Sequence, residues 1–320
     1  MIRLPLYDST SESRVLRPPA RHRFRNESKD PKMGYSKLLF PAILAGLVCV
    51  PASAEIQCRG LAAASDYSIG LVTSGGLATL FCTGLTGIDG VQSSKGFPLP
   101  YELAGIRVRV TGLDAPLLAV ADFGMYQQIN FQNPAETNDR SQFGSYALEV
   151  TQGEQRFESG PGRSSGPALF QDAKGYAIAQ HASNYSLVTK EDPARPGEYI
   201  ILYGTGVTNY SNVRNAPPLG MPAPFEPLAW TTAETDFARP IHGPFMRMVS
   251  PDLAGDNMSF SWVGLVPGAA GVFQMNFRMP AKVVSGSYWV IVGRAYEVIE
   301  ALRVRIVYVD GMGARLYVSE

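Results

Sequence analysis

Short alternations of apolar and polar residues run along most of this chain. In residues 105–110 three apolar side chains alternate with glycine or arginine, and residues 302–306 repeat that pattern. A period of two places successive side chains on opposite faces of a strand. Two further runs, 199–203 and 288–292, are apolar at nearly every position, as in strands buried on both faces. Gly- and Pro-rich turns separate these runs, so the pattern predicts an all-β chain built of antiparallel sandwiches.

Three sequence blocks occur twice in the same order. Each pairs strand or turn residues of the first half with counterparts in the second half: 81–85 with 203–207, 128–135 with 274–281, and 144–146 with 286–288. Repeated blocks in matched order indicate an internal duplication. A segment with linker composition, residues 159–167, separates the copies. We therefore predict two tandem immunoglobulin-like β-sandwiches, a first module over 55–160 and a second over 161–320.

The second module contains an insertion, residues 212–257, that is rich in proline and large aromatic side chains. Its aromatic residues, our candidate ligand-binding residues, are Phe225, Trp230, Phe237 and Phe245. Such side chains usually seek burial and would then plug the open end of the sandwich. Alternatively, they form an exposed platform for a sugar ring or an apolar partner surface. Trp262 and Trp289 lie in apolar runs and are expected in the core.

The N-terminal region has the composition of a cleaved export signal. Lys37 provides positive charge, residues 38–50 are mostly apolar, and residues 52–54 form a small-x-small cleavage site. The apolar run is shorter than the roughly 20 residues of a membrane-spanning helix, which disfavours the alternative of an anchor after a cytoplasmic tail. We therefore expect residues 1–54 to be a leader whose true start is Met33. The mature chain would be exported, to the periplasm or the extracellular space.

Charge and cysteine usage fit this expectation. The whole chain has 28 basic and 28 acidic residues, and the expected leader is rich in arginine. Its removal would leave an acidic excess, which argues against a nucleic-acid partner. Cys58 and Cys82 would be the remaining cysteines, and two cysteines in an exported chain most simply form one disulfide.

Motifs that could carry chemistry lack the context that each chemistry needs. Residues 162–166 match Gly-x-Ser-x-Gly, but Gly and Pro flank them in place of a strand and a helix. His181 and His242 have no second ligand at metal-binding spacing. Gly204-x-Gly206 lacks the third glycine of a dinucleotide site. We expect no catalytic residue, metal or cofactor. The alternative is a polysaccharide hydrolase whose carboxylates converge between the modules.

The blocks also resemble a known family. They are similar to the signature of acidobacterial secreted proteins with an uncharacterised Solibacter-type C-terminal domain, in four places over roughly residues 97–309: 115–118, 128–136, 202–206 and 264–276. The Gly-Thr-Gly turn in the third block is also similar to IPT/TIG modules. The resemblance implies exported immunoglobulin-like sandwiches and no known activity. Asp122-Phe123-Gly124 departs from the family, which often has a proline-containing turn there.

These observations predict a non-catalytic exported protein, acting as a binding or structural module of the envelope or the extracellular space. The partners that we consider are a surface glycan or another envelope protein. The insertion loop is the expected contact surface, because a sandwich presents its loops at its ends.

Overall fold

Strands make up almost all the regular structure of this computed structural model, as the period-two pattern predicts. The structure describes residues 55–135, 146–160, 162, 164–231, 243–250, 253–300, 303–311 and 313–320. Within these ranges the helical structure is one short 3-10 turn, η1 (Tyr210–Asn212). In the part of the chain that the structure describes, no helix has the length and apolar character needed to cross a membrane. The all-β prediction is confirmed.

The first half of the described chain forms two antiparallel sheets. Its strands are β1 (Gln57–Ala63), β2 (Leu77–Thr83), β3 (Val91–Ser93), β4 (Ile106–Val110), β5 (Leu113–Asp114), β6 (Leu117–Asp122), β7 (Gln127–Gln132), β8 (Leu148–Gln152) and β9 (Gln155–Ser159). One sheet has the order β1-β2-β7-β6-β3, and the other has the order β5-β4-β8-β9.

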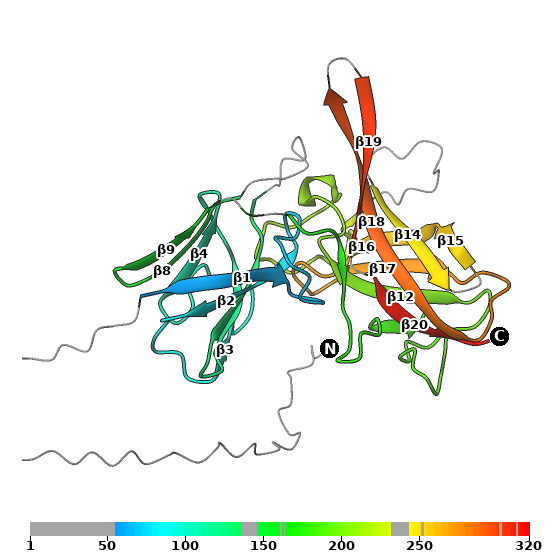
Figure 1. Cartoon of the computed structure of the whole chain (residues 1–320), viewed down its shortest axis with the longest axis horizontal. Coiled ribbons are helices and arrows are strands. Elements are labelled where there is room, and N and C mark those ends of the chain that lie inside the picture. Colours follow the sequence, from blue (N-terminus) through cyan, green and yellow to red (C-terminus); the bar gives the residue numbers. More distant parts are fainter. Residues whose placement is uncertain are drawn as a thin grey trace, which may run out of the picture. The chain divides into compact units, whose positions relative to one another are not determined.

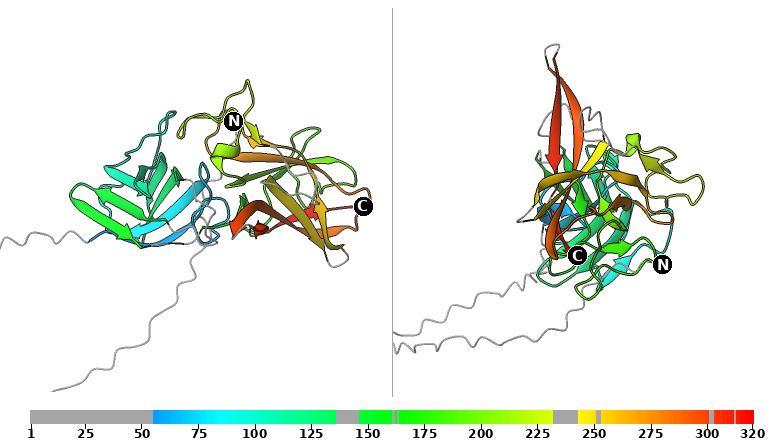
Figure 2. Two further views of the ribbon diagram at one scale, coloured as in Figure 1. Left: turned by 90° about the horizontal axis from the view of Figure 1, so that it is seen from above. Right: turned by 90° about the vertical axis from the view of Figure 1, so that its right-hand side faces the viewer.

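The second half is also built of two antiparallel sheets. They are β10 (Ala168–Leu169), β11 (Ala179–His181), β12 (Tyr199–Thr205), β13 (Trp230–Thr231), β14 (Gly243–Ser250), β15 (Leu253–Met258), β16 (Phe260–Leu265), β17 (Phe273–Arg278), β18 (Gly286–Glu300), β19 (Arg303–Asp310) and β20 (Ala314–Val318). One sheet has the order β10-β12-β17-β16-β13, with β11 also paired to β12. The other has the order β15-β14-β18-β19, with β20 also paired to β18. Beyond its pairing with β14, β18 continues with β19 as a hairpin that projects from the sheets (Figures 1 and 2).

Each pair of sheets encloses its own hydrophobic core. In the first half, Leu80 and Ile129 from one sheet meet Val108 and Val150 from the other. The second core is built in the same way from β12, β16 and β17 on one side and β14, β18 and β20 on the other. Apolar residues at every second position of a strand make this possible, because they all point toward the facing sheet. The described residues from Glu55 onward form one compact unit. The division into two separate immunoglobulin-like modules therefore stays a prediction.

The sequence duplication appears in the strand register. Phe81 pairs with Gln128 between β2 and β7, and Tyr203 pairs with Gln274 between β12 and β17. The register of β6 on β7 shifts between Leu117 and Ala119, and that of β16 on β17 shifts in the same way between Phe260 and Trp262. The first two pairs of repeated blocks therefore occupy equivalent places in the two halves. Residues 144 and 145 of the third pair lie outside the described residues.

The predicted disulfide is present. Cys58 and Cys82 face each other across β1 and β2, with 4.0 Å between their Cα atoms, and their sulfur atoms are bonded. The bridge ties the first strand of the described chain to the first repeated block.

The two halves are also joined by hydrogen bonds. The Thr205 hydroxyl accepts a 2.7 Å bond from the Leu77 amide and donates to the Gly271 carbonyl at 2.8 Å. The segment of linker composition is itself tied down, because the Ser165 amide donates to the Leu71 carbonyl at 2.8 Å. Within the Gly-x-Ser-x-Gly match, Ser165 therefore contacts the first half, and Gly166 lies against the Asp310 backbone of the second half.

Two tryptophans differ from their predicted place in the core. Trp289 on β18 is 49% exposed, and Trp262 on β16 is only partly buried. Their neighbours Val290 and Val263 fill the core in their place. Both runs are apolar at consecutive positions, but a strand can turn only alternate side chains inward, so one of each adjacent pair must face outward.

Candidate functional site

Residues 215–229 of the insertion form a loop, and backbone hydrogen bonds close this loop at its base. Arg214 and Trp230 exchange two backbone hydrogen bonds of 2.8 and 3.1 Å. Inside that base, the Asn215 side chain donates to the Leu228 carbonyl at 3.0 Å. Asn215 itself has a φ of 56°, a left-handed conformation that asparagine tolerates better than most residues. These bonds hold the loop against β13.

An aromatic groove with a volume of about 710 Å³ lies beside this loop. Its lining is mainly apolar and aromatic: Asn215, Phe225, Glu226, Pro227, Leu228, Trp230 and Trp262. Phe225 is 78% exposed, whereas Trp230 and Trp262 are partly buried. The groove therefore combines rings from the loop, from β13 and from β16.

Two glycines make room for these rings. A Cβ at Gly264 would overlap the ring of Trp262, and a Cβ at Gly268 would come within 3.2 Å of the Phe225 ring. The guanidinium carbon of Arg214 lies 4.8 Å from the centre of the Trp230 ring. A cation over an aromatic face is attracted by the ring quadrupole, so Arg214 helps to fix this ring. Aromatic side chains held in this way can contact a ligand with little loss of their own conformational freedom.

The structure describes three of the four candidate residues and divides them between two places. It brings Phe225 and Trp230 together in the aromatic groove. Phe245 is buried on β14 in the other sheet, where its ring occupies the space left by Gly293. Phe237 lies outside the described residues. Phe245 is therefore buried, whereas Phe225 is exposed.

A second depression, of about 550 Å³, lies where the two halves meet. Ser74 and Pro134 of the first half line it together with Tyr210, Ser211, Val213 and residues 215–219 of the second half. Asn215 lines both depressions. Glu226 is the carboxylate among the residues that line them, whereas the hydrolase alternative requires a pair.

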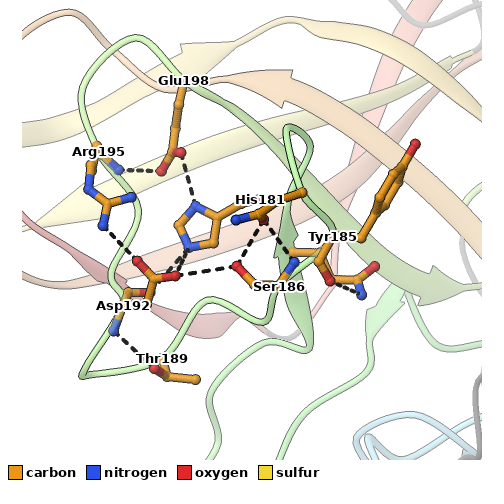
Figure 3. A network of polar contacts seen from close by, with 9 residues as sticks. His181, Tyr185, Ser186, Thr189, Asp192, Arg195 and Glu198 are labelled. Carbon is orange, nitrogen blue, oxygen red and sulfur yellow. Dashed lines mark hydrogen bonds and ion pairs between the residues drawn. The ribbon is translucent and has the colours of Figure 1, made fainter.

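His181, whose side chain is buried, is the centre of a polar network that the sequence pattern did not predict (Figure 3). Its Nδ1 lies 2.9 Å from a carboxylate oxygen of Glu198, and its Nε2 lies 3.4 Å from a carboxylate oxygen of Asp192. The Arg195 guanidinium donates to Asp192 at 2.6 Å. That hydrogen bond is the main reason why the pKa of Asp192 lies below its usual value. The network closes the turn between β11 and β12.

The contacts of this network hold the turn in place, and they do not have the arrangement of a metal site. The two carboxylates bind opposite nitrogens of the ring, so no single ion could contact all three groups. Among the described residues, no group of three or more His, Cys, Asp or Glu side chains is placed to hold a metal. The Ser186 hydroxyl lies 2.9 Å from the Asn184 side-chain oxygen and 3.3 Å from a carboxylate oxygen of Asp192. The ring nitrogens of His181 contact Glu198 and Asp192 instead, so Ser186 and His181 do not form a nucleophile–base pair. His242, the other histidine considered, lies outside the described residues.

The sequence contains signals for two further features, a turn that is repeated in both halves and the space that holds the Trp262 ring. The run Ala64-Ser65-Asp66-Tyr67-Ser68 is echoed by Ala182-Ser183-Asn184-Tyr185-Ser186. In each copy the Ser amide donates to the Asp or Asn side chain at 2.9 Å, and the tyrosine has a φ near 60°. The second signal is Gly264, two positions after Trp262, because a glycine on the same face of a strand leaves space for a large ring.

No family model matches this chain, and no curated protein matches it. The resemblance to the Solibacter-type family therefore stays a prediction.

Proposed function

We propose that this chain is an exported, non-catalytic binding module that holds a glycan in its aromatic groove. The observation that carries the proposal is the convergence of Phe225, Trp230 and Trp262 on one surface depression. Solvent-exposed aromatic faces offer a large apolar contact to the C–H face of a sugar ring. Asn215 and Glu226, on the same lining, can exchange hydrogen bonds with sugar hydroxyl groups.

Several features support the export and family parts of this proposal. The leader-like residues 1–54, the Cys58–Cys82 disulfide and the duplicated strand blocks are all typical of secreted β-sandwich proteins. The resemblance to the Solibacter-type family points to the same compartment. A protein partner in the envelope is the alternative occupant of the groove.

Substitution of Trp262 by alanine tests the groove. We expect Trp262→Ala to weaken retention on glycans by about tenfold or more, as loss of a central aromatic contact usually does. The full chain would be run in native gels containing xylan, mannan, hydroxyethylcellulose or alginate. Phe225→Ala should weaken retention in the same gels.

The matched control is Trp289→Ala. Trp289 is also an exposed tryptophan, but it lies on β18 in the other sheet. Equal retention of the wild type and both groove variants, or an equal loss for Trp289→Ala, would contradict a glycan site in the groove.

A further inference from the structure

Four aromatic rings form a continuous strip along the first half of the protein. Tyr67 lies in the turn after β1, Phe81 on β2, and Phe123 and Tyr126 in the turn between β6 and β7. Successive ring centres are 6.0 Å apart from Tyr67 to Phe81, 5.7 Å from Phe81 to Tyr126 and 5.3 Å from Tyr126 to Phe123. We call these four residues the aromatic strip.

The aromatic strip is open to solvent. Tyr67, Tyr126 and Phe123 are 57%, 38% and 49% exposed. Phe81 is partly buried, and it lies above Gly60, where a Cβ would come within 3.2 Å of the ring. Because exposed large aromatics that touch one another form a contiguous apolar patch, such a strip marks an interaction surface.

Tyr67, at one end of the aromatic strip, has a strained backbone conformation. Tyr67 has a φ of 58°, which is unfavourable for a bulky side chain. The turn is fixed by the Ser68 amide, which donates to Asp66 at 2.9 Å, and by the Tyr67 amide, which donates to the Ala63 carbonyl at 3.1 Å. Strain of this kind persists where the surrounding structure imposes it, as it also does at Tyr185 in the equivalent turn of the second half.

A row of neutral polar side chains runs beside the rings. Gln128 pairs with Phe81 in the sheet, and its side-chain amide donates to the Asn130 side-chain oxygen at 2.8 Å. The Thr79 hydroxyl donates to that same oxygen at 2.8 Å. These bonds fix the orientation of the amides. None of the strip residues or of these three polar residues is a carboxylate, an amine or a guanidinium.

We propose that the aromatic strip is a second binding site, which takes a single extended chain of a neutral oligosaccharide. The rings offer stacking faces at spacings comparable with the length of one sugar residue, and the neutral amides match the uncharged hydroxyl groups of such a ligand. Adjacent ring planes meet at 45°, 70° and 37°, so the strip is twisted. A twisted strip fits a soluble chain that can turn along its length and does not fit a flat crystalline surface.

The site is separate from the aromatic groove, so the full chain would be bivalent. Two linked sites on one polymer raise the overall affinity above that of either site, without any new contact. Failure of one site leaves the other proposal standing, because no residue is shared between the strip and the lining of the groove.

The test is Tyr126→Ala and, separately, Phe123→Ala, in the full chain. In native gels containing xylan, mannan or hydroxyethylcellulose, we expect each variant to bind at least one neutral polysaccharide about tenfold more weakly than the wild type. Retention on the acidic polysaccharide alginate should be unchanged by either substitution. Leu113→Ala, which changes an exposed apolar side chain in the other sheet of the first half, is the control.

Two results would overturn the proposal. One is equal retention of the wild type and the strip variants on every neutral polysaccharide. The other is concentration-dependent dimerisation, seen by sedimentation velocity, that disappears in Tyr126→Ala, because the strip would then bind a second copy of the chain. A loss in Trp262→Ala alone would support the groove and reject the strip.

Discussion

At the scale of single residues, His181 shows how one buried side chain can organise a turn. It stands where the first half has Ala63, and both residues accept the backbone hydrogen bond from the tyrosine of the repeated turn. The imidazole adds contacts to Glu198 and Asp192 that alanine cannot make. Residues 182–198 are therefore fastened by side chains, whereas the equivalent turn of the first half is fastened mainly by its backbone.

The acid dependence of stability tests the role of Asp192. The Arg195 hydrogen bond lowers the pKa of Asp192 in the folded protein, whereas an unfolded aspartate titrates near pKa 3.9. Its stabilising contribution is therefore fully present above about pH 4, and it is lost as the pH falls through the lower folded pKa. We expect Asp192→Asn to be less stable than the wild type at pH 7, with a difference that shrinks below about pH 4.

The measurement is the urea midpoint of both proteins between pH 7 and pH 3. Because Asp192 is on the surface, the difference should be small. Asp89→Asn, at an exposed position outside the network, is the control. A difference between wild type and Asp192→Asn that grows toward acid pH would contradict the assignment.

At the scale of elements, the repeated unit is a strand arrangement whose outward face varies between copies. β2 pairs with β7, and β12 pairs with β17, in the same register. Within β7, the Gln128 side-chain amide donates to the Asn130 side-chain oxygen at 2.8 Å. Within β17, Gln274 donates to Asn276 in the same way at 2.9 Å. Beside this shared row, the first half carries the aromatic strip, and the second half carries Trp262.

The disulfide is expected to contribute to the stability of this arrangement. Cys58 and Cys82 are 24 residues apart, and cross-linking a loop of that length stabilises a fold by about 3 kcal/mol in the chain-entropy description. The double variant Cys58→Ser, Cys82→Ser should lose about that free energy of unfolding, as measured in urea. Wild-type protein unfolded in the presence of a reducing agent should match the variant, and equal stability of all three samples would contradict the prediction.

At the scale of the whole molecule, contacts between the halves make one unit out of two cores. Tyr210 of the second half lies against Gly75 of the first half, and its backbone amide donates to the Ser74 hydroxyl oxygen at 3.0 Å. Burial raises the pKa of Tyr210 to about 12. The Thr205 hydroxyl supplies a second connection through Leu77 and Gly271.

Gly75→Ala should weaken the contact between the halves. A Cβ at Gly75 would overlap the Tyr210 ring, and the residue has a φ of 75°. We expect a loss of stability of about 2–3 kcal/mol from overpacking and backbone strain together. By spectrophotometric titration, the pKa of Tyr210 should also move down toward 10, because the ring is displaced toward water.

The control for this substitution is Gly87→Ala. Gly87 has a similar φ of 67°, but no atom lies within 4 Å of the position that its Cβ would take. It should therefore show backbone strain alone, of about 1 kcal/mol, and an unchanged titration of Tyr210. Equal losses for the two variants would mean that the contact with Tyr210 contributes nothing.

The sequence by itself determined the all-β class, the duplication and the Cys58–Cys82 bridge. Each depends on local signals: a period of two, a repeated order of blocks, and the pairing of two cysteines. Only the tertiary structure decided which aromatic side chains are exposed and which of them meet. Phe245 is buried, Trp262 and Trp289 are not in the core, and Phe81 meets Tyr126 from another strand. The physical reason is that alternation assigns side chains to two faces, but the packing of a second sheet selects the face that becomes the core.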